Sequence, residues 1–181
     1  MISPVSPVSV SIIVTCQEQR SQLGQLLPSL LSQHYEGEYE VIVVDMMHDK
    51  DTDEWLEEMM VHYPNLSHTF CPVSARGIDL RKLALTLGAK AANYEWLVFL
   101  SAGMETPGGD WLPRLTASCG EGVDVVIGKT RQRRWSALSI FRHRQKFSIF
   151  YPTSSIILCR RSIPLQNGPQ IPKQRITRVP L

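Results

Sequence analysis

Short apolar, β-branched segments alternate with helix-patterned segments over the first 127 residues, and this alternation constrains the possible fold more than any other feature. Three segments predict buried strands: 8–14 is β-branched and begins with alternation, 40–45 is short and apolar and ends with an acid, and 96–100 is apolar throughout. Leucines and alanines recur at helical spacing in 23–31 and 81–92. Because strands that alternate with helices build βαβ units, we expect an α/β fold with a mostly parallel sheet and helices on both faces.

Weaker patterns complete this arrangement. Residues 53–61 predict a helix, with Asp51 or Thr52 as its N-cap. Three further segments predict a strand, a short helix and another strand, in that order: 66–71, 111–117 and 123–127.

The charges are divided unevenly along the chain. Residues 1–124 hold 7 Lys/Arg and all 17 Asp/Glu, whereas residues 125–181 hold 12 Lys/Arg and no acid. Such asymmetry predicts that the C-terminal part meets something anionic: the acidic N-terminal part, a diphosphate, a membrane surface or nucleic acid. No recognised nucleic-acid module is present, so we do not expect nucleic acid as the partner.

The four cysteines are widely spaced, which favours reduced thiols over a disulfide framework or a zinc site. The N-terminal residues have no signal-peptide pattern, and no apolar stretch approaches the roughly 20 residues of a membrane-spanning helix. We therefore expect a cytoplasmic protein, with peripheral contact at the inner membrane as an option.

Ligands of parallel sheets bind where the strands end. The three strand ends carry polar or small residues: Thr15, Gln17, Glu18, Asp45, Ser101 and Gly103. We expect these residues to form the binding site. We interpret His48, in the loop after Asp45, as a solvated loop residue.

The order and spacing of these segments resemble glycosyltransferase family 2. The runs VSIIVTCQE (10–18), EVIVVD (40–45) and LALTLGAKAANYEWLVFLSAG (83–103) carry the resemblance, which covers roughly residues 8–127. Residues 154–168 more faintly resemble the segment where those enzymes return to the sheet. The resemblance implies a GT-A fold with a Rossmann-like sheet, a nucleoside-diphosphate sugar as donor and usually Mg²⁺ or Mn²⁺.

The resemblance also implies roles for individual residues. Asp45 matches the family's acid after the second strand, which usually accepts a hydrogen bond from the nucleobase. Three basic residues, Arg76, Arg81 and Lys82, lie where the family often places cations near the diphosphate. A basic first turn opposes the helix dipole, which agrees with a bound anion there.

The chain departs from the family where the chemistry is expected. The metal-binding DxD motif is replaced by Ser101-Ala102-Gly103, although Mg²⁺ and Mn²⁺ prefer several charged oxygen ligands. Inverting members also use a carboxylate base in the acceptor half, where this chain has no acid. We therefore assign no metal ligand and no catalytic residue.

Two functions remain open. One is transfer of a sugar from a nucleotide sugar to a glycan or lipid-linked acceptor. The other is an inactive homologue that binds a nucleotide, a membrane surface or a partner.

We expect one domain over residues 1–163, with a shortened acceptor region at about 128–153. Within it, 129–150 combines basic and apolar residues and predicts peripheral contact with an anionic membrane, a cationic clamp for phosphate, or a solvated helix. Residues 164–181 are rich in proline and basic residues, which predicts a flexible tail.

Overall fold

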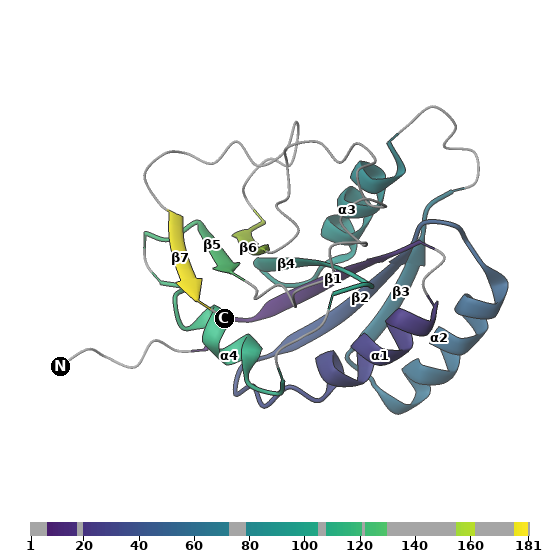
Figure 1. The fold of residues 1–181 in the computed structure, drawn as a ribbon, viewed down its shortest axis with the longest axis horizontal. Coiled ribbons are helices and arrows are strands. Elements are labelled where there is room, and N and C mark those ends of the chain that lie inside the picture. The colour runs from purple at the N-terminus through teal and green to yellow at the C-terminus, as the bar shows by residue number, and fades with distance from the viewer. Residues whose placement is uncertain are drawn as a thin grey trace, which may run out of the picture.

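The computed structural model shows one sheet flanked by helices (Figure 1). The structure describes residues 7–17, 20–72, 79–104, 108–120, 122–129, 155–161 and 176–180. The helices and strands in these ranges are, in chain order, β1 (Val10–Cys16), α1 (Arg20–Leu31), β2 (Tyr39–Asp45), α2 (Lys50–His62), β3 (Leu66–Phe70), α3 (Leu80–Ala91), β4 (Trp96–Ser101), α4 (Trp111–Thr116), β5 (Val125–Lys129), β6 (Ser155–Arg160) and β7 (Ile176–Pro180).

The seven strands form a single mixed sheet in the order β3-β2-β1-β4-β6-β5-β7. Strands β3, β2, β1 and β4 are parallel neighbours, as the βαβ pattern predicted. Strand β6 runs antiparallel to both β4 and β5, and β7 runs parallel to β5. The prediction of a mostly parallel Rossmann-like α/β sheet is confirmed, and β6 is the return to the sheet expected after residue 154.

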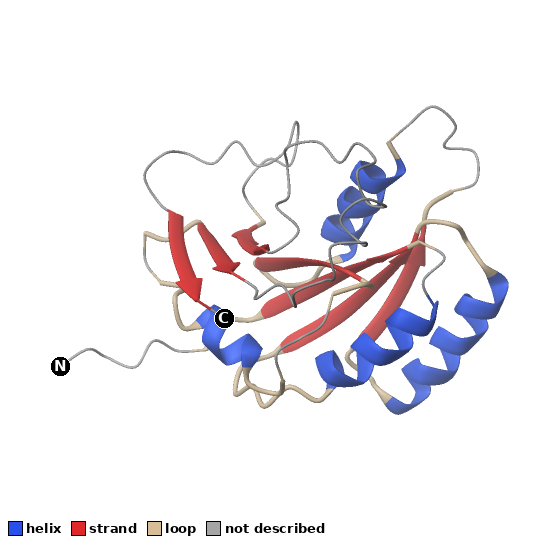
Figure 2. Cartoon of the chain, viewed as in Figure 1, coloured by secondary structure: helices blue, strands red, loops and turns tan. Residues whose placement is uncertain are grey.

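Helices cover both faces of this sheet (Figure 2). Helices α1, α2 and α4 pack on one face, where alternate residues of β1 such as Ile12 and Val14 meet leucines of α1. Helix α3 packs on the other face, against Ile13 of β1 and Ile42 and Val44 of β2. Because β1 and β2 are buried on both faces, apolar residues follow one another at 12–14 and 41–44 instead of alternating with polar ones.

A buried glutamine joins α1 to α4. Gln33 lies just after α1 and is 7% exposed. Its amide nitrogen donates to the carbonyl oxygens of Ser29 (2.6 Å) and Gly108 (3.0 Å), and its carbonyl oxygen accepts from the N–H of Leu112 (3.2 Å). This last bond satisfies a backbone donor in the first turn of α4.

The predicted flexible tail is wrong for residues 176–180. They form β7 and pair with β5 in register, from Val125 with Ile176 to Lys129 with Pro180. The segment Ile-Thr-Arg-Val is rich in β-branched residues, which favour strands, and a terminal proline is tolerated on an edge strand. The ordered sheet therefore extends beyond the expected boundary at residue 163.

The other predictions about the C-terminal part lie almost entirely outside the described residues. This holds for the acceptor region at about 128–153 and for the basic segment 129–150, of which the structure describes only the end of β5. None of the helices in the described ranges is both long and apolar enough to cross a membrane.

Candidate functional site

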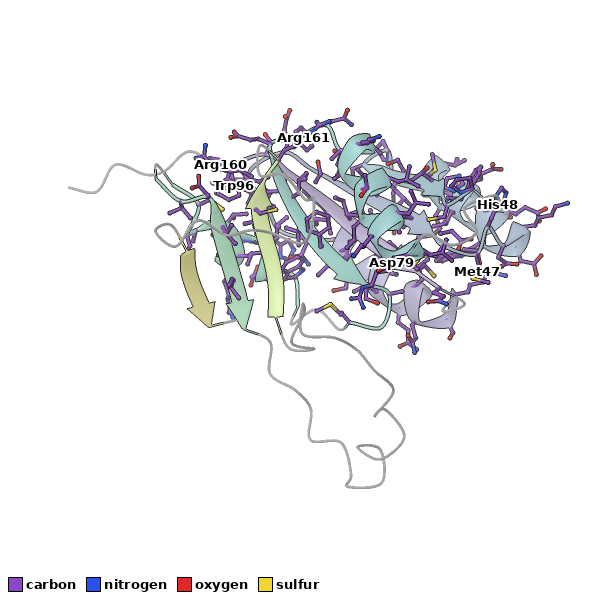
Figure 3. All side chains as sticks on the ribbon, turned by 90° about the horizontal axis from the view of Figure 1, so that it is seen from above. Met47, His48, Asp79, Trp96, Arg160 and Arg161 are labelled. Carbon is purple, nitrogen blue, oxygen red and sulfur yellow. The ribbon has the colours of Figure 1, made fainter. Side chains whose placement is uncertain are left out.

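A hollow of about 460 Å³ lies at the carboxyl ends of β1 and β2, beside the start of α2. Seven residues line it: Cys16, Arg20, Asp45, Met47, His48, Asp49 and Thr52. Figure 3 shows Met47 and His48 together at one end of the molecule, away from Trp96 and Arg160. The hollow is thus at the sheet edge where ligands of parallel sheets bind.

Asp45 is the last residue of β2 and is almost fully buried, with 2% of its surface exposed. One carboxylate oxygen accepts the N–H of Met47 and the other accepts the N–H of Asp49, both at 2.8 Å. The side chain therefore shapes the loop between β2 and α2. A carboxylate has about four acceptor positions, so these two bonds leave capacity for a ligand donor.

The loop ends at the N-cap of α2. Asp49 accepts hydrogen bonds from the N–H (3.1 Å) and the hydroxyl (2.7 Å) of Thr52. The prediction of Asp51 or Thr52 as the N-cap, with a helix from residue 53, is wrong. Asp49 is the N-cap, because its carboxylate binds Thr52 three residues later and the helix therefore begins at Lys50. Thr52 instead becomes a first-turn residue that lines the hollow.

His48 lies in the loop after β2 as expected, but it is held between β3 and α2 and is only 33% exposed, so it is less solvated than expected. Its backbone has a φ of 53°, in the left-handed region. Its ring lies 3.8 Å from that of Phe70 between centroids, at 46°. Its Nε2 lies 3.7 Å from a carboxylate oxygen of Asp53, whose other oxygen lies 3.6 Å from Nδ1 of His68.

A family model matches nearly the whole chain, including the strands that form the hollow. The model of glycosyl transferase family 2 matches residues 11–180. The chain belongs to glycosyl transferase family 2. The match includes the region of β7, beyond the boundary expected from the sequence.

A curated relative is similar to this chain over part of its length. The undecaprenyl-phosphate 4-deoxy-4-formamido-L-arabinose transferase of Proteus mirabilis (strain HI4320) is 28% identical over 127 residues, which are 69% of this chain and 38% of that protein. The chain therefore spans well under half the length of this curated relative.

Solved structures share the fold at lower identity. A mannosyltransferase from Pyrobaculum calidifontis, solved in complex with GDP-Man and Mn²⁺, superposes with a TM-score of 0.67 at 18% identity, over 98% of this chain and 57% of that chain. S. aureus TarS (residues 1–349) in complex with UDP-GlcNAc superposes with a TM-score of 0.61 at 23% identity, over 88% of this chain and 47% of that chain. The GT-A fold expected from the sequence is confirmed.

Of the strand-end residues proposed for the family 2 donor site, the structure places Asp45 in the hollow. Register brings Thr15 beside Ser101 and Cys16 beside Asp45. The hydroxyl of Thr15 is buried and donates to the carbonyl oxygen of Leu100 at 3.3 Å, so it serves the sheet. Gln17 and Gly103 are exposed near this edge and Ser101 is half-buried, but none of the three lines the hollow.

The predicted cations lie apart from the hollow or outside the described residues. Arg81 and Lys82 are exposed on the first turn of α3, and no described residue lining the hollow comes from that helix. The carboxylate of Asp79 caps this turn by accepting both of their N–H groups, at 3.1 and 3.3 Å. This acid offsets the expected conflict with the helix dipole. Glu18 and Arg76 lie outside the described residues.

The residues at the DxD position do not fit a divalent cation. Ala102 is 1% exposed, and its N–H donates to the carbonyl oxygen of Thr15 at 3.0 Å. The N–H of Met104 closes a turn onto the carbonyl oxygen of Ser101 at 2.9 Å. Mg²⁺ and Mn²⁺ require several oxygen ligands, preferably carboxylates. Within the described ranges no three His, Cys, Asp or Glu side chains are grouped to hold a metal ion.

Proposed function

We propose that this chain binds the nucleoside end of a nucleotide sugar in the hollow beside Asp45 and serves transfer of that sugar to a glycan or lipid-linked acceptor. The observation that carries the proposal is the hollow itself, which lies at the carboxyl ends of β1 and β2 in a chain of glycosyl transferase family 2. We propose that Asp45 lies at the centre of the donor site. The other site residues assigned from the sequence would surround it: Thr15, Gln17, Glu18, Ser101 and Gly103.

The lining of the hollow fits a nucleoside better than a diphosphate. Asp45 and Asp49 present hydrogen-bond acceptors, which suit the N–H groups of a base and the hydroxyls of a ribose. Met47 and His48 offer apolar and aromatic surface for the faces of a base. Arg20 contributes the one positive charge among the lining residues that the structure describes.

The diphosphate would then extend away from the two acids. In the transfer, an acceptor oxygen forms a bond to the anomeric carbon while the bond to the diphosphate breaks, and negative charge collects on the leaving group. Cationic side chains stabilise such charge. We propose Arg76, Arg81 and Lys82 for this role, with Arg20 as an addition from the structure. Where a divalent cation participates, it would supply the same charge stabilisation, and the residues at 101–103 do not supply its ligands.

The proton of the acceptor hydroxyl needs a base, and we assign none. Residues 125–181 contain no Asp or Glu. The second candidate function, donor binding without transfer by this chain, therefore stays open beside transfer. Binding and turnover must therefore be measured separately.

A lipid-linked acceptor is supported by two observations. The relative from Proteus mirabilis is named for undecaprenyl-phosphate, a lipid phosphate. The basic and apolar residues of 129–150 suit contact with an anionic membrane surface.

Titration calorimetry with UDP and GDP, each with and without Mn²⁺, tests donor binding. We expect Met47→Glu to weaken binding of the preferred nucleotide at least about tenfold, because it replaces apolar surface for the base with a third carboxylate beside Asp45 and Asp49. Val61→Glu is the matched control, since Val61 is 82% exposed on α2 and does not line the hollow. Absence of binding for both nucleotides, or equal affinities for the two variants, contradicts the proposed site.

Donor hydrolysis and transfer, measured with UDP-GlcNAc and GDP-mannose, separate the two candidate functions. Release of nucleotide or transfer of sugar supports the transferase. Nucleotide binding with no turnover favours the chain as a donor-binding module.

A further inference from the structure

Two histidines flank one aspartate behind the hollow. His48 comes from the loop after β2, Asp53 from the first turn of α2 and His68 from β3. Nε2 of His48 lies 3.7 Å from one carboxylate oxygen of Asp53, and Nδ1 of His68 lies 3.6 Å from the other. We call these three side chains the His–Asp–His cluster. Two segments of the chain, the loop after β2 and strand β3, thus meet at one carboxylate of α2.

The cluster is partly shielded from water. The exposed side-chain fractions are 33% for His48, 18% for Asp53 and 16% for His68. Three of its polar atoms are buried without a hydrogen-bond partner: Nδ1 of His48, Oδ1 of Asp53 and Nδ1 of His68. Buried polar atoms without partners cost free energy. At 3.6–3.7 Å the two nitrogen–oxygen pairs are too long for good hydrogen bonds, so a small movement would complete them.

The strength with which the two histidines pair with Asp53 depends on whether they are protonated. A neutral imidazole donates from one nitrogen, whereas an imidazolium donates from both and carries a positive charge. Histidine ordinarily changes its charge between about pH 5 and 8. Protonation of either histidine would therefore pair an imidazolium with the partly buried carboxylate of Asp53 and draw the cluster together.

His48 connects the cluster to the hollow. It lines the hollow and lies between Met47 and Asp49, whose N–H groups bind Asp45. Its φ of 53° is unfavourable for a residue with a Cβ, so the surroundings must hold it. Phe70 contacts one side of the ring, and Asp53 lies close to Nε2. The position of this part of the hollow therefore depends on Asp53.

We propose that Asp53 and His68 are positioning residues that hold His48 at the hollow and make nucleotide affinity rise as the pH falls through the titration range of histidine. The affinity part rests on the function proposed above. The other titratable groups near His48 come from the elements around the hollow: Cys16 of β1, Arg20 of α1, Asp45 of β2 and Asp49 at the start of α2.

Calorimetry between pH 6 and 8 tests the affinity. We expect the preferred nucleotide, UDP or GDP, to bind about tenfold more tightly at pH 6 than at pH 8, the ratio that about 1.4 kcal/mol of coupling produces. Asp53→Asn and His68→Asn should each reduce this ratio to less than about threefold. The corresponding uncharged nucleoside, uridine or guanosine, should show the same dependence. A dependence seen with the nucleotide but absent with the nucleoside would overturn positioning, because it indicates simple attraction of phosphate by a protonated histidine.

A measurement on the free protein separates this proposal from the proposed function. We expect the ring-proton resonances of His48 and the amide resonances of Met47 and Asp49 to move together with pH. In Asp53→Asn this coupled movement should be lost. The control is Glu57→Gln, which removes an exposed carboxylate one turn further along α2.

If Asp53→Asn titrates as the wild type does, positioning is wrong even where nucleotides bind. If the coupled movement is found but no nucleotide binds, the proposed function fails and the positioning stands. His68→Asn provides the same test should Asp53→Asn not fold.

Discussion

Single carboxylate side chains order the backbone at both ends of the central strands. At the amino ends of the strands, Glu40 accepts from the hydroxyl of Ser11 (2.6 Å) and from the N–H (2.6 Å) and side-chain amide (2.7 Å) of Asn93. At the carboxyl ends, Asp45 binds the loop that forms the hollow. Hydrogen bonds to a charged acceptor stabilise more than neutral ones, so each carboxylate orders its own edge of the sheet.

The cysteines act as small apolar residues. All four are reduced and buried, as their spacing predicted. Burial raises the pKa of Cys71 next to the hollow, and the negative charge of Asp45 raises it further. Since the thiolate is the nucleophile, Cys71 is poorly suited to nucleophilic catalysis.

Cys159 makes stability depend on pH in the alkaline range. Burial raises the pKa of its thiol from 9.0 to about 12. Below pH 9 the thiol is protonated in both states and contributes nothing. Between pH 9 and 12 only the unfolded state ionises, so the free energy of unfolding should fall by about 1.4 kcal/mol per pH unit through this group. Urea unfolding at pH 8, 9.5 and 10.5 should show this loss in the wild type relative to Cys159→Ala.

The buried Val126→Ala provides the control for cavity formation, because Val126 has no titratable group. Its difference from the wild type should not change with pH. A pH-independent difference for Cys159→Ala as well would contradict the raised pKa.

At the scale of elements, two helical glycines have opposite surroundings. Gly88 lies where α3 packs on the sheet, and a Cβ there would come within 2.3 Å of Cγ2 of Ile13 and 3.2 Å of Cγ2 of Val44. Gly24 lies in α1, where a Cβ would meet the ring of Trp55 at 3.8 Å, an ordinary contact. The close approach of α3 to β1 and β2 therefore depends on Gly88.

Alanine at these two positions should change stability in opposite directions. Gly24→Ala should raise the free energy of unfolding by up to about 1 kcal/mol, the difference in helix propensity. Gly88→Ala should lower it by about 1–3 kcal/mol, because the added methyl group forces α3 away from β-branched Ile13. Chemical denaturation of both variants checks this. Stabilisation by Gly88→Ala would mean that α3 packs less closely than the structure shows.

At the scale of the whole molecule, the C-terminal segments extend the sheet that the first four strands begin. β6 inserts next to β4, and β5 and β7 follow outward (Figure 1). Strand β7 covers an edge of β5 that would otherwise expose unpaired backbone groups. The basic part of the chain thus contributes backbone pairing to the same sheet as the acidic part.

Removal of residues 176–181 tests the role of β7. We expect the midpoint of thermal unfolding to fall by at least about 2–4 °C, the shift that 1 kcal/mol produces in a chain of this size. The exposed edge of β5 should also increase self-association, which size-exclusion chromatography measures. An unchanged midpoint and an unchanged elution volume would agree with the flexible tail expected from the sequence instead.

The sequence by itself determined the parallel half of the sheet. Continuous apolar runs arise because these strands are buried on both faces, and that burial is local enough to be visible as a pattern in β1, β2 and β4. It also determined the position of Asp45, since the residue that ends a parallel strand lies at the ligand edge whatever the loop does. The antiparallel return of β6 was indicated by resemblance alone.

Only the tertiary structure decided which side chains form the hollow. Thr15 and Asp45 both lie near the carboxyl ends of their strands, but the hydroxyl of Thr15 donates to a carbonyl oxygen of β4, whereas Asp45 binds its own loop. His48 reaches the hollow through a left-handed backbone, a contact with Phe70 and a carboxylate on α2. The pairing of 176–180 with β5 likewise joins segments about fifty residues apart. Such contacts depend on the packing of distant segments, so no local pattern of residues specifies them.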